Sequence, residues 1–170
     1  MQVDLIDAKD PATLVGLWVE TFRQAYDGVH AAEDIDAYCE ANFTLDAATT
    51  ALADPATRCR LAMMDGKPAG LLGVRDTPCP SPLSGPSAEL KQIYVLASAY
   101  GTGLGPGLFE DALSILRAWS CQWMWLCVSD WNQRAKAFYA KHDFARAGAG
   151  PVLEVGSDRL PSSILVRPVQ

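Results

Sequence analysis

The sequence predicts an α/β fold in which strands and helices alternate along one domain of residues 1–170. Near the amino end, Leu14, Trp18 and Phe22 recur with the spacing of one helix face. Further along, Asp65-Gly66 separates two apolar runs and is a strong signal for a two-residue hairpin turn. In the second half, two apolar runs are each followed by a helical pattern. This alternation favours parallel neighbouring strands joined by right-handed crossovers.

The first half is expected to contain a strand, three helices and a hairpin. Asp10 is a suitable N-cap for the first helix, and Pro11 suits the first helical position, where the N–H that proline lacks would be unpaired anyway. The expected elements are a strand at 3–8, helices at 11–26, 32–43 and 45–52, and hairpin strands at 60–64 and 68–75.

A proline-rich loop leads into the second half. Residues 77–87 contain four prolines and one glycine, which argues against an internal strand because proline has no N–H for a ladder. Two roles are open: a flexible connector, or a flap over an active site, since the loop runs directly into the next strand. The elements expected after it are a strand at 89–97, a helix after the glycines of 101–105, an apolar strand at 122–128, a helix capped by Asp130, and strands at 144–147 and 163–166.

Composition argues against several classes of protein. Every apolar run is far shorter than a membrane span, and the amino end lacks the pattern of a signal peptide, so we expect a cytoplasmic protein without membrane contacts. A net charge of −6 is unsuited to nucleic acid, whose phosphates require Lys and Arg. The five cysteines form no C-x-x-C pair and the two histidines add no ligand spacing, so we expect reduced thiols and no metal site.

The negative charge is concentrated in one segment. Residues 24–57 contain seven Asp or Glu and no Lys or Arg, so this segment carries −7 and the rest of the chain +1. One interpretation is a set of solvated helix faces. The other is an attractor for a cationic substrate.

Alternating glycines follow the apolar strand at 89–97. The run Tyr100-Gly101-Thr102-Gly103-Leu104-Gly105 is not the G-x-G-x-x-G dinucleotide motif, because the sixth position is Pro106 in one register and Leu108 in the other. No Gly-Lys-Ser/Thr follows, which rules out a P-loop. A glycine loop that enters a helix presents bare backbone N–H groups to an anion, although the glycines alone are equally consistent with a structural turn.

Two segments together resemble the Gcn5-related N-acetyltransferase (GNAT) superfamily. Its acetyl-CoA loop is commonly Q/R-x-x-G-x-G/A, and residues 100–105 match its glycines. Its second motif, N-x-x-A-x-x-F-Y-x-x-x-G-F, is matched at Asn132, Ala135, Phe138, Tyr139 and Phe144. The resemblance is close over 89–148 and looser elsewhere. It implies a mixed, mostly antiparallel sheet of about seven strands, with a splayed parallel pair and helices on both faces.

The resemblance also implies acetyl-CoA as cosubstrate, with no metal, and assigns residues to it. Backbone groups of Ile93, Tyr94 and Val95 would bind the pantetheine arm. The amides of Tyr100, Gly101, Thr102, Gly103, Leu104 and Gly105 would hold the pyrophosphate at the positive end of the next helix. Gly103 and Gly105 would keep a Cβ out of the path of the phosphate.

The second motif supplies two side chains. Asn132 would contact the CoA arm, or else merely begin its helix. Tyr139, two turns further, would protonate the departing thiolate, or else be a packed aromatic residue.

The chain departs from the family pattern at three positions. Tyr100 replaces the usual Gln or Arg, and Thr102 stands where Lys or Arg is common, so the loop carries less positive charge. Three cations on the helix of the second motif are candidates to supply the missing positive charge, namely Arg134, Lys136 and Lys141. Asp143 replaces a glycine after that helix, a change that Asp tolerates because it adopts left-handed turns more readily than most residues.

The mechanism implied by the family is direct attack of an amine on the thioester in a ternary complex. A base must remove a proton from the amine, since alkylamines are mostly protonated at neutral pH. Glu89 is one candidate, at the start of the splayed strand and, by simple alternation, on the face of Ile93. Asp130, just after the buried strand, is another. Either can instead be the solvated end of an element.

The acceptor is predicted from a narrower resemblance. The segments 21–55, 93–105 and 138–144 are similar to the PaiA-like branch, which includes enzymes that acetylate spermidine and spermine. Asp27 and Glu33 in the acidic segment would then face a polycationic amine. Two alternatives stay open: acetylation of a protein N-terminus, an aminoglycoside or another small amine, and a non-catalytic module that only binds acetyl-CoA. A homodimer is also open, with Trp119, Trp123, Trp125 and Trp131 as candidate contact residues or, more simply, core residues.

Overall fold

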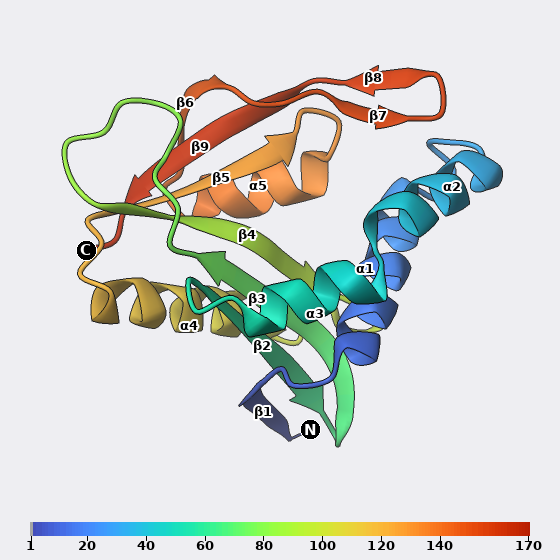
Figure 1. Cartoon of the computed structure of the whole chain (residues 1–170), viewed down its shortest axis with the longest axis horizontal. Coiled ribbons are helices and arrows are strands. Elements are labelled where there is room, and N and C mark those ends of the chain that lie inside the picture. The colour runs from blue at the N-terminus through green and yellow to red at the C-terminus, as the bar shows by residue number, and fades with distance from the viewer. Residues whose placement is uncertain (1) are drawn as a thin grey trace.

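The computed structural model describes residues 2–170 and shows a seven-stranded sheet with helices on both faces (Figure 1). The sheet order is β1-β2-β3-β4-β5-β9-β6, and β7 and β8 form a separate hairpin. The strands are β1 (Val3–Asp7), β2 (Thr57–Met64), β3 (Lys67–Arg75), β4 (Ser87–Val95), β5 (Trp123–Ser129), β6 (Ala145–Ala149), β7 (Leu153–Val155), β8 (Asp158–Leu160) and β9 (Ser162–Pro168). The helices are α1 (Pro11–Tyr26), α2 (Ala32–Asn42), α3 (Leu45–Ala53), α4 (Leu104–Ala118) and α5 (Gln133–Lys141), with a 3-10 turn, η1, at Ala97–Ala99.

The first half forms as its local sequence predicts. The Asp10 carboxylate accepts hydrogen bonds from the backbone N–H groups of Ala12 and Thr13, so it caps α1. Asp65 and Gly66 have φ values of 49° and 78°, the left-handed pair that a tight hairpin turn requires between β2 and β3.

One pair of neighbouring strands in the sheet is parallel, and that pair is short. β4 and β5 pair only where Ser87–Glu89 lies beside Trp123–Trp125, and beyond these residues the two strands separate. All other neighbours are antiparallel. The expectation of parallel neighbours is therefore confirmed for β4 and β5 and wrong for β5 and β6. The last strand, β9, returns between β5 and β6 and is antiparallel to both.

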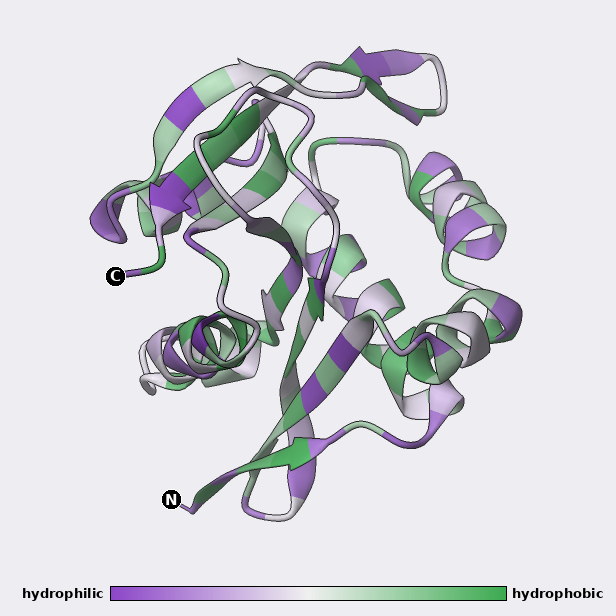
Figure 2. Ribbon diagram, turned by 60° about the vertical axis from the view of Figure 1, so that its left-hand side comes forward, coloured by the Kyte–Doolittle hydropathy of each residue, from purple (hydrophilic) through white to green (hydrophobic). Residues whose placement is uncertain are grey.

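The core has two layers, one on each face of the sheet. α4 and α5 cover one face, where Leu108, Phe109 and Leu116 of α4 pack against Leu72 and Met124 of the sheet. α1 and α3 cover the other face, around Leu14, Trp18 and Leu71. Figure 2 shows helical segments on the two sides of the strands. The opening between β4 and β5 therefore connects two covered faces.

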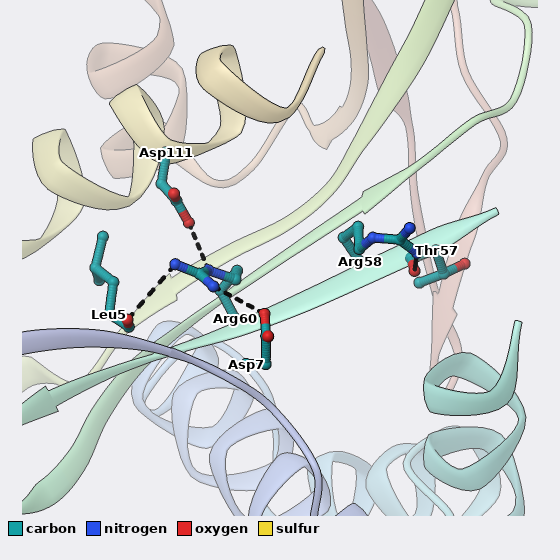
Figure 3. Close-up of polar contacts among 6 residues, drawn as sticks. All are labelled: Leu5, Asp7, Thr57, Arg58, Arg60 and Asp111. Carbon is teal, nitrogen blue, oxygen red and sulfur yellow. Dashed lines mark hydrogen bonds and ion pairs between the residues drawn. The ribbon is translucent and has the colours of Figure 1, made fainter. Parts of the chain in front are cut away.

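An arginine ties the edge of the sheet to α4. Arg60 on β2 pairs with Asp7 of β1 (Nη1 to Oδ1, 2.8 Å) and with Asp111 of α4 (Nε to Oδ2, 2.9 Å), and it also reaches the Leu5 carbonyl (Figure 3). Arg60 lowers the pKa of Asp7, mainly through their hydrogen bond. The network holds the short β1 strand and fixes α4 over the sheet.

The β7–β8 hairpin was not predicted from the sequence. Val155 and Leu160 of this hairpin are buried against Phe22, Tyr26 and Ile35, so it covers the ends of α1 and α2 (Figure 1). Its three-residue strands are too short to show an alternating pattern. Across residues 2–170, no helix has the length and apolarity to cross a membrane, and no cluster of metal-binding side chains occurs.

Candidate active site

The opening in the sheet is shaped by a β-bulge in β4. Gly73 of β3 pairs with Gln92 of β4, but the next residue, Val74, pairs with Leu90, so Lys91 is an extra residue. The bulge shifts the alternation, because Leu90 and Ile93 both pack in the core beneath α4. From Leu90 onward, the β4 edge that faces β5 has no strand partner, which leaves its backbone groups available to a ligand. This edge contains Ile93, Tyr94 and Val95, the segment predicted to bind pantetheine.

The glycine loop ends in an uncapped helix start. Gly103 is the N-cap of α4 and provides no side chain to the first turn. The backbone N–H groups of Gly101, Gly103, Leu104 and Gly105 donate to no backbone carbonyl within the described chain. The amides of Tyr100 and Thr102, which were also expected to hold the pyrophosphate, are already used within the chain, since they donate to the carbonyls of Ala97 and Ala99. The Thr102 hydroxyl donates to the Ala99 carbonyl as well. The free amides form a cradle for an anion at the positive end of α4.

Backbone conformation and helix packing account for the glycines of this loop. A Cβ on Gly103 would meet no protein atom within 4 Å, and the expectation that glycine is needed there to admit a phosphate stays a prediction. Gly103 is needed because its φ is 89°, and Gly101 because its φ is 77°. A Cβ on Gly105 would lie 3.3 Å from the Phe138 ring, so Gly105 lets α5 approach α4.

The start of α5 differs from the prediction. Asn132, not Asp130, is the N-cap, and its Oδ1 accepts a hydrogen bond from the Ala135 N–H at 3.0 Å. Asp130 lies two residues earlier, and its carboxylate instead accepts a hydrogen bond from the Ser163 hydroxyl of β9 at 2.7 Å. The Asn132 amide nitrogen forms no hydrogen bond within residues 2–170, so it is free to donate to a ligand. Asp143, the second residue after α5, has φ 60°, as expected of a glycine substitute.

Tyr139 lies on the buried side of α5. It is 8% exposed and packs against the rings of Phe138 and Phe144. Burial raises the pKa of its phenol well above the usual value, and the nearby Tyr94 on β4 adds to the rise. Tyr139 therefore stays protonated at neutral pH, and it lies near Tyr94 of the open segment of β4.

A cation lies against the first residue of the cradle. The Arg134 guanidinium carbon of α5 sits 3.5 Å from the centre of the Tyr100 ring. Lys141 is seven residues further along α5, about 10 Å along the helix axis. Of the cations considered from the sequence, Arg134 is the one that contacts the glycine loop.

The opposite side of the opening is lined by groups from distant parts of the chain. Because of the bulge, the expectation that Glu89 shares a face with Ile93 is wrong. Glu89 is half-buried beside Trp125. Burial raises the pKa of the Cys127 thiol, and the nearby Glu89 carboxylate adds to the rise. Tyr26 of α1 lies near Ser129 at the end of β5.

The proline-rich loop lies beside this region. The Trp125 indole donates a hydrogen bond to the Thr77 carbonyl at 2.8 Å, and the Ser81 hydroxyl reaches the Ala147 carbonyl of β6. The loop thus rests on β5 and β6. Of the four tryptophans considered for dimer contacts, Trp125 is buried and Trp131 is the one that is largely exposed, at 52%.

The acidic segment is partly neutralised. Asp36 pairs with Arg23, and Asp54 lies 3.6 Å from Arg75. Asp27, at the end of α1, and Glu33, in the first turn of α2, are exposed and form no ion pair within residues 2–170. Both carboxylates lie next to the turn between α1 and α2.

Comparisons with known proteins identify the family. Residues 16–144 match the model of the acetyltransferase (GNAT) family. The chain belongs to the GNAT family. An uncharacterised N-acetyltransferase of Lactobacillus delbrueckii subsp. lactis is 29% identical over 161 residues, covering 94% of this chain and 92% of that protein. One of Mycobacterium tuberculosis is 30% identical over 138 residues, covering 79% of this chain and 83% of that protein. The PaiA N-acetyltransferase of Thermoplasma acidophilum, solved with coenzyme A, superimposes with a TM-score of 0.80 at 17% identity, covering 99% of both chains.

The GNAT fold predicted from the two motifs is therefore confirmed, including the seven-stranded mixed sheet and the splayed pair. The chain is an N-acetyltransferase that uses acetyl-CoA as its donor. The remaining question for this GNAT protein is which of its own residues act, and on which amine.

Sequence reasoning missed one side chain in this GNAT protein. The His30 side chain, in the turn between α1 and α2, is 1% exposed, and its Nδ1 lies 2.8 Å from the Asp158 carboxylate of β8. Its Nε2 is the one buried side-chain polar atom without a partner in the described residues. The His30 ring is stacked with Trp131 and packs at a tilt against Tyr26. No local pattern marks it, because its partner lies 128 residues away.

Proposed function

We propose that this enzyme transfers the acetyl group of acetyl-CoA to a primary amine of a polyamine such as spermidine or spermine, by direct attack in a ternary complex. The observation that carries the proposal is that the splayed β4–β5 pair leads to an uncapped, glycine-lined helix start on one side and to a wall with free carboxylates on the other. Donor and acceptor can thus approach the same opening from opposite faces of the sheet.

On the donor side, the open backbone of Ile93, Tyr94 and Val95 would hydrogen-bond the pantetheine arm. The amides of Gly101, Gly103, Leu104 and Gly105 would hold the pyrophosphate, assisted by the dipole of α4. Asn132 would donate its free amide N–H to the arm while its oxygen caps α5. The backbone supplies most of these contacts, so the donor is positioned by the fold itself.

Tyr139 is proposed as the general acid. When the amine attacks the thioester carbonyl, the C–S bond of the resulting intermediate breaks and the sulfur leaves as a thiolate. The Tyr139 phenol would give its proton to that sulfur. Because burial raises its pKa, the phenol holds its proton across the physiological pH range, and a proton from solvent restores it after each turnover.

Glu89 is proposed as the base that takes a proton from the ammonium. It is half-buried at the closed end of the opening, on the face opposite α4, and it forms no ion pair within residues 2–170. Asp130 is the second candidate. One of its carboxylate oxygens already accepts the Ser163 hydrogen bond, so fewer of its lone pairs are free to take a proton from the amine, and it is the weaker choice.

Asp27 and Glu33 are proposed to attract the distal ammonium groups of the acceptor. Neither carboxylate is neutralised by an ion pair within the described chain. Both flank the turn that contains His30, whose ring is stacked with Trp131. A polyamine offers cationic groups several bonds apart, so one amine can react while another stays near these acids.

The test is release of CoA measured with acetyl-CoA and a panel of acceptors. The panel contains spermidine, spermine, a monoamine of equal length, an amino acid, an aminoglycoside and a short peptide with a free amino terminus. The proposal expects the polyamines to have the highest kcat/KM. A preference for the peptide would overturn the polyamine assignment. Binding of acetyl-CoA with no turnover on any amine would favour the non-catalytic module instead.

A further inference from the structure

We propose that Arg134, held flat against Tyr100, supplies the positive charge that the glycine loop itself lacks and binds the phosphate groups of CoA. The proposal concerns the donor site only, and it deepens the proposed function by assigning a role to a residue at a variable position of the second family motif. It also assigns a role to Tyr100, the residue that replaces the usual Gln or Arg.

The loop has no cation of its own. Between Tyr100 and Phe109 there is no Lys or Arg, and the first charged residues of α4 are the acids Glu110 and Asp111. Pro106, in the first turn of α4, removes one of the backbone donors that a phosphate would otherwise use. Amides and the helix dipole alone would therefore face a ligand with several negative charges.

Arg134 is placed to correct this deficit. Its guanidinium carbon lies 3.5 Å from the centre of the Tyr100 ring, the distance of a stacked pair. Arg134 forms no ion pair and no hydrogen bond within residues 2–170, so its N–H groups remain free at the edge of the stack. A planar guanidinium can stack on a ring through its face and still donate through its edge, whereas a lysine ammonium cannot do both.

The packing of α5 on α4 fixes this position. Phe138 is four residues after Arg134 and so lies on the same face of α5, and its ring is the group that a Cβ on Gly105 would meet at 3.3 Å. Arg134 therefore sits one turn nearer the start of α5, on the side where the loop lies. Lys136 points to another side of the helix, since two residues turn the helix by about 200°.

Tyr100 then has an indirect role. The family commonly has a Gln or Arg at this position of the loop. In this chain the aromatic ring instead orders the arginine of another helix. Because Tyr100 is 40% exposed and Arg134 is exposed, their stack forms a surface at the mouth of the cradle and not part of the core.

The experiment is calorimetric titration of the purified enzyme with CoA, which requires no acceptor amine. Arg134→Ala should raise the Kd about tenfold, as expected for loss of a charge-assisted phosphate contact. Arg134→Lys should recover only part of the affinity. Lys136→Ala removes the same charge from the same helix and should change the Kd less than twofold. Each variant is also melted without ligand, and an unchanged Tm shows that the fold is intact.

Tyr100 is tested in a cycle with Arg134. Tyr100→Ala alone should raise the Kd about threefold. In the Arg134→Ala background it should have no further effect, because a ring that only orders the arginine has nothing left to order. Equal losses from Tyr100→Ala in both backgrounds would overturn the indirect role of Tyr100.

Three ligands separate the sources of phosphate. A loss that is equal with CoA and with 3′-dephospho-CoA assigns Arg134 to the pyrophosphate, and a loss confined to CoA assigns it to the 3′-phosphate. Pantetheine, which has neither group, should bind wild type and Arg134→Ala equally. Unchanged affinity of Arg134→Ala for CoA, or an equal loss with pantetheine, would overturn the proposal. Failure of the polyamine assignment would alter none of these titrations.

Discussion

The proposed donor side and the proposed acceptor side of this enzyme are built in different ways. Most of the proposed donor contacts come from an unpaired stretch of β4, the backbone amides of one glycine loop and one helix start, with side chains of α5 beside them. The proposed acceptor side combines side chains of α1, α2, β4, β5 and the β7–β8 hairpin, which are far apart in sequence. A site made of backbone leaves a local sequence pattern, because glycine and helix-start residues must follow one another. A site made of distant side chains leaves no such pattern.

The largest effect should come from Tyr139, the proposed general acid on the donor side. Tyr139→Phe removes the phenolic proton and keeps the ring that packs on Phe138 and Phe144, so kcat should fall about 100-fold with the KM for acetyl-CoA nearly constant. Because burial raises the pKa of Tyr139, the wild-type rate should show no loss from its ionisation up to the usual phenol pKa.

The control for this variant is Tyr38→Phe. Tyr38 is another partly buried tyrosine, stacked on Phe22 with ring centres 4.5 Å apart, and it lies on α2 on the acceptor side. Its loss of a hydroxyl should change kcat less than twofold. Steady-state kinetics with saturating acetyl-CoA measures both. An unchanged kcat in Tyr139→Phe would remove Tyr139 from the mechanism.

The next effect should come from the base. Glu89→Gln keeps the shape of the side chain and removes its proton affinity, so kcat/KM for the amine should fall about tenfold or more near neutral pH. The deficit should shrink as the pH approaches the pKa of an alkylamine, about 10, because the acceptor then arrives already neutral. A pH–rate profile of wild type, Glu89→Gln and Asp130→Asn measures this.

A deficit that is independent of pH would mean that Glu89 has a structural role. A larger deficit in Asp130→Asn, with the same alkaline recovery, would transfer the role of base to Asp130. These two outcomes differ from each other and from the expected one, so the profile decides among the candidates.

The same contrast explains which parts of the fold and of the site can be predicted from the sequence. The hairpin at Asp65-Gly66, the cap at Asp10 and the helix after Gly103 were predicted because each is fixed within a few residues. The face of Glu89 was predicted wrongly, because a bulge at Lys91 depends on pairing with β3 and cannot be recognised in β4 alone. The order of β9 between β5 and β6 likewise depends on long-range pairing.

A smaller effect is expected from the acidic wall. The double variant Asp27→Asn, Glu33→Gln should raise the KM for spermidine about threefold to fivefold and flatten its dependence on salt, since exposed charges act at long range and are screened. The Kd for CoA should stay the same, and so should the KM for a monoamine. Glu40→Gln, another exposed acid of α2, is the matched control. An equal rise in KM for the control variant would mean that the effect comes from the overall negative charge of the protein and not from Asp27 and Glu33.

The smallest effect should come from the contact that closes the acceptor side. Asp158→Ala leaves the buried Nδ1 of His30 without its partner, which should lower the free energy of unfolding by about 1–2 kcal/mol. Much of that loss should be local, because Val155 and Leu160 anchor a hairpin with only three residues in each strand. Hydrogen exchange should therefore accelerate across 153–160 and in the turn at 27–31, while α4 keeps its protection.

The control for this variant is Glu154→Gln in the same hairpin. Glu154 pairs with Arg159, but both side chains are more than 60% exposed, and such pairs contribute little to stability. If Asp158→Ala raises the KM of the amine while the Kd for CoA is unchanged, the acceptor wall can loosen without disturbing the donor cradle. If both constants change together, the two sides are coupled through the opening in the sheet. The donor side would then not be independent of the side chains that form the acceptor side.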